Sequence, residues 1–402
     1  MHPAIIHNRQ GPRPGYLLPA IAVALLVVGL AVALVLDRLW IDAAQLELRT
    51  AAEAAALAGA SRLVDDGILT ETFDASGRAQ IARDTAAAVA GRNFAAGNPV
   101  TLDASLGGDV LVGRIALDDT GREVFLETES SPTTVLVFAG RTRGRSNPVA
   151  LFFKGLTGQF TADVVSPAEA TIDGRVVGVA SLPGGAVPAV PLAILNNDPL
   201  GERTDTWRRQ IEERSGGDRY SFDAAAGVVR EQPDGIPEIV LHSAPRNATA
   251  DEETEANCHV IDVGTGLVAS RIAEQCRSGF LEGHLGGFGG QLRFDDGAVP
   301  FRCDSQANSS AAHALRAIIG QPRICLLYDS IEPSSSWKQT RVWATRLAAG
   351  RILDVSTDED GGFQIVFQPT CVTTRAAILR EDLSEGPIVS PDIYVYKLHL
   401  TQ

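Results

Sequence analysis

The residues of this chain that could do chemistry are first of all its cysteines, which are Cys258, Cys276, Cys303, Cys325 and Cys371. Together with His259 and His284, they could form a zinc site. Zinc sites usually carry pairs of ligands a few residues apart, and the chain has no C-x-x-C or H-x-x-x-H pair. We therefore predict no metal site and no cofactor.

Disulfide bonds are the second chemistry open to these cysteines, provided that they lie in an oxidising compartment. Cys325 and Cys371 fall in or beside predicted strands, which could be neighbours in one sheet. Cys258 and Cys276 flank a predicted strand and helix. We predict one disulfide within each of these two pairs. Because five is an odd number, one thiol is left over, and we assign this free thiol to Cys303.

Catalytic patterns are the third possibility. The glycine-rich segment 283–290 is neither a Walker loop nor a dinucleotide-binding fingerprint, and the chain has no G-x-S-x-G elbow. We predict no catalytic residue and no enzymatic activity. The net charge of −14 and the absence of a long basic run argue against phosphate-backbone contacts, so we expect no nucleic-acid partner.

An uncharged segment, residues 16–36, determines where the cysteines and all later elements lie. A helix needs about 20 apolar residues to cross the hydrocarbon core of a bilayer. We therefore predict one transmembrane helix that contacts lipid through residues 16–36. Two alternatives are a cleaved secretory signal, whose apolar core is usually shorter, and a pilin-type cleavage after Gly15. The second lacks the usual acidic residue, which is replaced by Ala20.

The charges that flank this segment indicate its orientation. Arg9 and Arg13 precede it without an acid, whereas acidic residues outnumber basic ones just after it. By the positive-inside rule, the N-terminus (1–15) is cytoplasmic and the rest of the chain lies outside the cytoplasm.

The remaining sequence predicts an α+β fold: an N-terminal transmembrane helix that continues into a helical stalk, then β-rich extracytoplasmic domains with a few short helices. The predicted parts are a stalk (37–67), a first β-rich α+β domain (68–182), a Pro/Gly linker (183–191) and a C-terminal β-rich α+β domain (192–402).

Short β-type runs bounded by Gly, Asp, Asn and Pro predict the strands. They lie at 110–113, 123–126, 133–142, 149–153, 160–168, 238–242, 259–263, 323–328, 341–355, 363–368 and 393–400. Short helices are predicted at 79–94, 266–277 and 310–319.

The stalk is rich in alanine, which favours helix, and Gly67 suits its C-terminal cap. Its face of small residues would let another helix approach closely. Two interpretations are equally open: this face binds another protein or a second copy of the chain, or it packs on the β-rich part of the same chain.

Four stretches resemble the TadG-like proteins associated with Flp (Tad) pilus assembly. Residues 39–60, LWIDAAQLELRTAAEAAALAGA, resemble the family's entry into the stalk. The second stretch, 86–114, runs from a predicted helix to a strand with the sequence DVLVGR. The third, 136–153, contains LVFAGRT and NPVALFF. The fourth combines IIGQPR (318–323) with VFQP (366–369) and VYKL (395–398). The C-terminal pattern is similar to members with a long C-terminal domain. Residues 354–358, DVSTD, lack the D-x-S-x-S metal loop of members that carry a von Willebrand A domain.

The resemblance implies a single-pass protein of the bacterial inner membrane that acts by protein–protein contact, in pilus assembly or surface attachment. Its partners would be other pilus-assembly or envelope proteins. The alternatives are a membrane-anchored extracytoplasmic hydrolase or carbohydrate-binding protein, and a minor pilin-like subunit.

Overall fold

The computed structural model describes residues 17–71, 75–333, 340–380 and 392–401. Two compact units divide the chain. Unit 1 comprises Met1–Ala55, Ala86–Val110 and Val137–Ala168, and unit 2 comprises Ala56–Thr85, Leu111–Leu136 and Glu169–Gln402. An N-terminal long apolar helix is followed by a β-rich region with a few short helices, which agrees with the predicted α+β class. The predicted cytoplasmic segment 1–15 lies outside the described residues.

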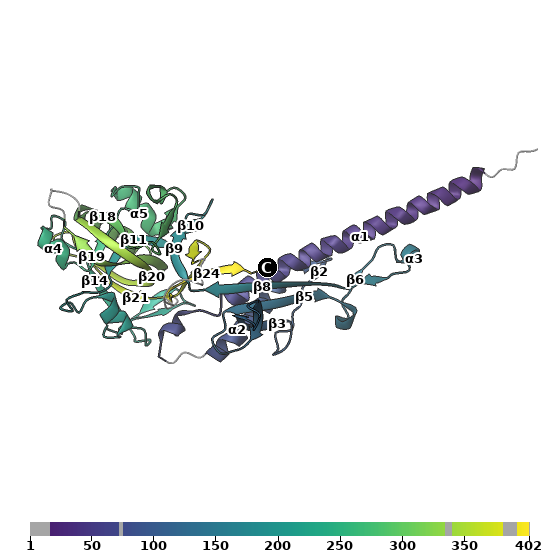
Figure 1. Cartoon of the computed structure of the whole chain (residues 1–402), viewed down its shortest axis with the longest axis horizontal. Helices are drawn as coiled ribbons and strands as arrows, with labels where there is room; N and C mark the ends of the chain where they lie inside the picture. The colour runs from purple at the N-terminus through teal and green to yellow at the C-terminus, as the bar shows by residue number, and fades with distance from the viewer. Residues whose placement is uncertain (1–16, 72–74, 334–339, 381–391, 402) are drawn as a thin grey trace, which may run out of the picture. The chain divides into compact units, whose positions relative to one another are not determined.

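Helix α1 (Leu17–Ala60) is a single uninterrupted helix of 44 residues, drawn in purple in Figure 1. Pro19 is tolerated because its missing N–H lies in the first turn, where no carbonyl partner precedes it. The helix ends at Ala60, before the predicted cap at Gly67. Its end is closed by bonds from Ser61 N to Leu57 O and from Arg62 N to Gly59 O, both 3.0 Å. The chain turns here because Leu63 and Val64 are buried.

The other helices are short. They are α2 (Ala75–Ala90), α3 (Lys154–Thr157), α4 (Ala250–Glu255), α5 (Ala269–Ser278) and α6 (Asn308–Arg316), with a 3-10 turn η1 (Asp66–Leu69) after α1. Helices α5 and α6 confirm the helices predicted at 266–277 and 310–319, within a few residues at each end.

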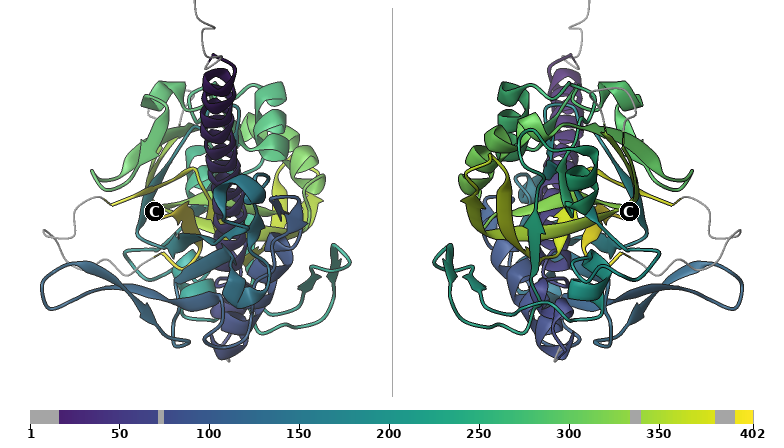
Figure 2. Two further views of the ribbon diagram at one scale, coloured as in Figure 1. Left: turned by 90° about the vertical axis from the view of Figure 1, so that its right-hand side faces the viewer. Right: turned by 90° about the vertical axis from the view of Figure 1, so that its left-hand side faces the viewer.

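A seven-stranded sheet forms the centre of unit 2, drawn in teal to yellow and seen from two further sides in Figure 2. Its order is β14-β21-β20-β19-β11-β15, and β18 also pairs with β20. The strands are β11 (Ala189–Leu195), β14 (Ile239–His242), β15 (Cys258–Val260), β18 (Val299–Cys303), β19 (Pro322–Glu332), β20 (Thr340–Thr357) and β21 (Phe363–Pro369). Helices α5 and α6 contact each other, and they lie against β11 and β20 respectively.

A six-stranded sheet has the order β22-β24-β8-β5-β3-β4. Its strands are β3 (Val110–Leu117), β4 (Glu123–Glu127), β5 (Thr134–Arg141), β8 (Val164–Asp173), β22 (Val372–Thr374) and β24 (Val395–Leu400). A smaller sheet joins β17 (Gln291–Arg293), β9 (Val176–Ala180) and β23 (Ala377–Leu379). The paired strands are β1 (Phe94–Ala95) with β2 (Asn98–Pro99), β6 (Val149–Ala150) with β7 (Thr161–Ala162), β10 (Ala186–Val187) with β16 (Phe280–Leu281), and β12 (Ser221–Asp223) with β13 (Val228–Arg230).

Strand β11 falls partly within the segment predicted to be a linker, 183–191. All seven of its residues are buried, between β19 on one side and β15 on the other. Pro191 lies where the pairing with β19 shifts register, between Ala189 and Ala193, and a proline is tolerated at such an irregularity because no ladder bond needs its N–H. The Pro/Gly composition of residues 183–191 predicted a linker, but the end of this segment belongs to a central strand of the sheet.

A network around Asp66 ties the segment after α1 to the main sheet of unit 2. The Asp66 carboxylate accepts from the Thr370 hydroxyl, from Cys371 N at 2.9 Å, and from Arg351 Nη2 at 2.8 Å. The Arg351 side chain is buried and also donates to Gly320 O at 2.7 Å. These contacts join residues about 300 positions apart, so they anchor the segment after α1 to the C-terminal strands of the sheet.

The Asp66→Ala variant should lower the free energy of unfolding by about 2 kcal/mol, because a buried guanidinium loses its carboxylate partner. Urea titration of the detergent-solubilised chain, followed by tryptophan fluorescence, measures this. Asp119→Ala removes an exposed carboxylate and is the matched control. Equal midpoints for the two variants would contradict the role given to Asp66.

Candidate membrane span and the hairpin at its base

The first half of α1 has an apolar surface that the rest of the protein does not cover. Within the described residues, it is the one helix that is long and apolar enough to cross a membrane. Large apolar side chains are exposed along it, among them those of Leu18, Leu25, Leu26, Val28 and Val35. This confirms the predicted apolar helix, although Tyr16 lies outside the described residues. An exposed apolar surface of this size marks a site of contact with a membrane or with another protein.

The second half of α1 has a buried stripe along one face within unit 1. Ala33, Asp37, Ala44, Leu48 and Ala55 are all buried, at spacings of four or seven residues that place them on the same side of the helix. The small-residue face of the predicted stalk is therefore covered by the chain's own packing in this region. The covering starts at Ala33, within the last turn of the uncharged segment.

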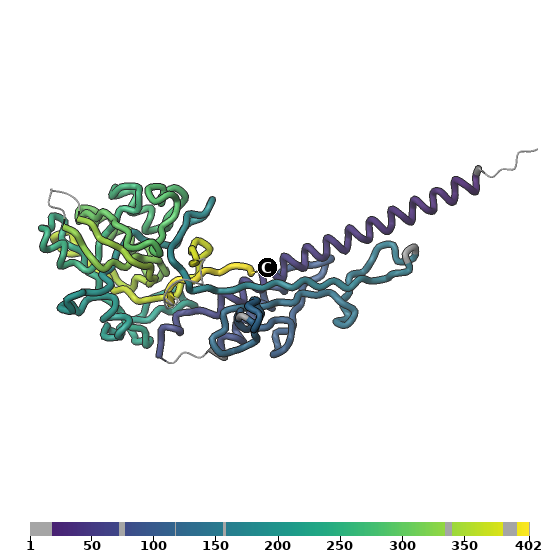
Figure 3. Tube along the Cα trace, in the orientation of Figure 1, coloured from purple at the N-terminus to yellow at the C-terminus, as the bar shows by residue number. Residues whose placement is uncertain are grey.

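Polar contacts fix a hairpin against α1 at the level of Asp37. Asp37 Oδ1 accepts from Phe152 N at 2.9 Å and from Phe153 N at 3.3 Å. One turn further along, Trp40 Nε1 donates to Ala150 O at 3.2 Å, and the Trp40 ring lies 5.0 Å from the ring of Phe152. The hairpin is formed by β6 and β7 and by residues 151–160 between them, and its path beside α1 can be followed in Figure 3.

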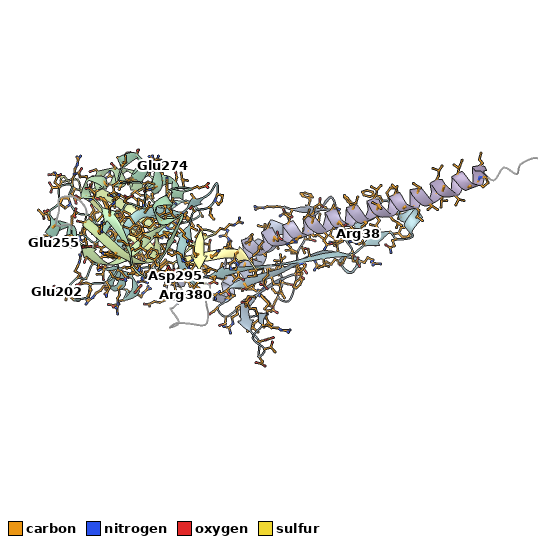
Figure 4. The ribbon with its side chains drawn as sticks, turned by 45° about the horizontal axis from the view of Figure 1, so that its top comes forward. Arg38, Glu202, Glu255, Glu274, Asp295 and Arg380 are labelled. Carbon is orange, nitrogen blue, oxygen red and sulfur yellow. The ribbon has the colours of Figure 1, made fainter. Side chains whose placement is uncertain are left out.

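An open apolar hollow of about 450 Å³ lies where the hairpin meets the helix. It is lined by Leu36, Leu39, Trp40, Phe152 and Phe153. Arg38, labelled in Figure 4, is the first basic residue on α1 after the apolar segment. Its guanidinium pairs with the Asp42 carboxylate at 3.2 Å. The end of the apolar segment thus combines aromatic rings, an apolar hollow and one ion pair. Sequence reasoning predicted the apolar helix but gave no role to the hairpin.

The cysteines are free thiols in the structure, so neither predicted disulfide is formed. Cys325 lies on β19 and Cys371 follows β21, and both strands pair with opposite sides of β20. Two strands separated by a third are about 10 Å apart, beyond the reach of a disulfide. Cys258 lies on β15 of the sheet, whereas Cys276 lies on helix α5. Burial raises the pKa of all five thiols, that of Cys276 to about 12, so none is an activated nucleophile.

A small enclosed space in unit 2 brings together two residues weighed above as metal ligands. His259 and Cys303 line a cavity of about 10 Å³ with Glu253, Asp304 and Asn308. That volume holds about one water molecule. Burial lowers the pKa of His259 to about 4, which keeps its imidazole neutral. His284 lies elsewhere, with its Nδ1 accepting from Leu281 N at 3.1 Å. Among the described residues, no group of three or more His, Cys, Asp or Glu side chains could hold a metal ion.

Comparisons with protein-family models, with curated proteins and with solved structures found no match to this chain.

The buried His259 should make the protein less stable in acid. Its pKa is about 4 in the folded chain and about 6.5 in the unfolded chain, so below pH 6.5 only the unfolded state gains the proton. The free energy of unfolding should therefore fall as the pH drops from 6.5 to 4, by about 3 kcal/mol in total. Urea titrations of the wild type and of His259→Gln across this range measure the difference.

The exposed histidine variant His313→Gln is the control and should keep the wild-type pH dependence. If His259→Gln also keeps it, then His259 does not cause the acid sensitivity.

Proposed function

We propose that this chain is a single-pass membrane protein that anchors β-rich units outside the cytoplasm and acts by protein–protein contact. The observation that carries the proposal is helix α1. Its first half exposes apolar side chains and its second half is buried along one face by unit 1, with no break between them. The first half of such a helix can lie in lipid, and its second half can pack against protein.

The orientation follows from the charges. Arg9 and Arg13 precede the apolar segment, and Asp37 is the first charge after it. The positive-inside rule then leaves the short N-terminus in the cytoplasm and units 1 and 2 on the other side. The resemblance to TadG-like proteins implies that this membrane is the bacterial inner membrane, with the bulk of the chain in the periplasm.

The role in assembly of a Flp (Tad) pilus, or in surface attachment, rests on the resemblance to TadG-like proteins in the four stretches described above. The first of these stretches has a clear place in the fold. The resembling stretch 39–60 coincides with the covered half of α1, in which Ala44, Leu48 and Ala55 are buried. The likeness therefore has a packing reason, since small side chains let the helix lie close to its neighbours.

Charges at the centre of the apolar segment should release the protein from the membrane. Replacing Leu26 and Val27 by arginine costs about 5 kcal/mol or more for insertion at the middle of a span. The double variant should move from the carbonate-resistant membrane pellet to the soluble or degraded fraction. The matched control replaces Gln45 and Leu46 by arginine. Leu26 is 68% exposed and Leu46 is 66% exposed on the same helix, so only the environment differs.

The control variant should stay in the pellet. Equal behaviour of the two variants, whether both remain in the membrane or both leave it, would contradict the assignment of residues 16–36 as the span.

A photo-crosslinking amino acid at an exposed site should capture the partner. Leu46 on α1 and Leu200 in unit 2 are both strongly exposed. In intact membranes of the native host we expect crosslinks from at least one of them to a component of the pilus machinery, identified by mass spectrometry. The same probe at Leu26 should capture mainly lipid. Adducts from Leu46 and Leu200 that contain only this chain, or only unrelated envelope proteins, would refute the pilus role.

A further inference from the structure

The loop 151–160 differs in composition from the rest of this acidic protein. Its sequence, LFFKGLTGQF, contains no acidic residue and a single basic residue, Lys154, in a chain with 49 acidic residues. Phe152 is 63% exposed and Phe160 is 64% exposed. The loop is a closed hairpin, since Leu151 N donates to Phe160 O at 3.1 Å and β6 pairs with β7. The exposed surfaces of these two phenylalanines are called the apolar patch below, and one edge of it, the Phe152 ring, lies 5.0 Å from the ring of Trp40.

The position of this hairpin along α1 indicates what covers the patch. The part of the helix that is exposed at every residue, Leu18 to Gly29, is about 18 Å long at about 1.5 Å per residue. The hydrocarbon core of a bilayer is about 30 Å thick. A span of that thickness must also take in Leu30 to Val32 and the following turn, Ala33 to Leu36. Ala33 is buried, and the hairpin binds Asp37 directly after this turn. Phe152 and Phe153, whose N–H groups bind Asp37, therefore lie at the level where hydrocarbon gives way to headgroups.

We infer that the loop 151–160 inserts Phe152 and Phe160 into the interfacial layer of the bilayer, so that unit 1 contacts the membrane at a second point beside α1. This inference rests on the proposed membrane span. The occupant of the patch is lipid because the apolar surface is continuous: Leu36 and Leu39 of the helix and Phe152 of the loop line the same open hollow.

The chemistry of the contact fits an interface between lipid and water. Aromatic residues concentrate at the headgroup level, and Trp40 and Phe152 lie side by side there. Lys154 is exposed, next to the exposed rings, and its ammonium can pair with lipid phosphates. A carboxylate at this depth would be costly without partners. Asp37 gains two from the loop itself, the N–H groups of Phe152 and Phe153.

Asp37 therefore has a positioning role. Its bonds hold the loop at one height on the helix, so the loop and the span enter the membrane together. A helix alone can rotate and tilt in a bilayer. A second contact on one side restricts both motions and gives unit 1 a defined side that faces the membrane.

The test uses the full chain in vesicles of three parts phosphatidylethanolamine to one part phosphatidylglycerol, some of it carrying a nitroxide at the headgroup. Four native cysteines are buried, so Cys371→Ser leaves a background with little labelling. An environment-sensitive fluorophore is attached through Phe160→Cys in that background. The matched control is Phe94→Cys, because Phe94 is 60% exposed and also belongs to unit 1. It neighbours Ala96, whose N–H bonds to Glu47 at 2.7 Å, well beyond the span.

We expect the label at position 160 to be quenched several-fold more by the nitroxide lipid than the label at position 94, and several-fold less by iodide in the water. Equal quenching at the two positions would overturn the inference. A label at position 160 that is shielded from both quenchers would overturn it as well, because a protein surface would then cover the patch.

A third label, through Val27→Cys, separates this inference from the proposed function. Quenching by a nitroxide deep in the acyl chains at position 27, without quenching at position 160, leaves the anchor in place and removes the second contact. Absence of quenching at position 27 refutes the membrane span itself.

Discussion

The structure depends on one constraint, which is that α1 is a single rigid helix with two different surroundings. From Leu18 to Gly29 every residue of the helix is exposed, and from Ala33 onward one face is buried. A helix satisfies its own backbone hydrogen bonds, so it needs no help from a solvent or from neighbours over the bare part. The contacts that hold the second half of α1 in unit 1 therefore also determine the direction of the apolar first half of the same helix.

Unit 1 holds the helix with small residues and a few polar contacts. Ala44 and Ala55 let the neighbouring chain approach closely, while Glu47 accepts a bond from Ala96 N and Asp37 accepts two from the hairpin. Each carboxylate lies on the helix and each donor is a backbone N–H of a turn. The main chain thus determines the geometry of the contacts that hold the helix. The contacts of Asp37 place an aromatic hairpin at the end of the apolar segment.

Unit 2 is organised differently, around a sheet whose polar groups are enclosed. The thiols are buried or nearly so, His259 is neutral, and Arg351 is held between Asp66 and Gly320. These side chains are the ones that a search for chemistry would single out. Burial suppresses their reactivity, since it favours the uncharged thiol and imidazole. Their role in this fold is packing and the joining of distant segments.

The amino-acid order by itself determined the apolar helix, the α+β class and most long strands, because each rests on a local period: residues 341–355 predicted β20, and 363–368 predicted β21. Tertiary structure alone decided the rest. Pro188 and Pro191 led to the prediction of a linker, but β11 is a central strand of the sheet. Neighbouring elements bury all of its residues. The separation of Cys325 from Cys371 is set by the strand order. The hairpin joins α1 because Asp37 binds Phe152, 115 positions away, and no local pattern encodes a contact of that length.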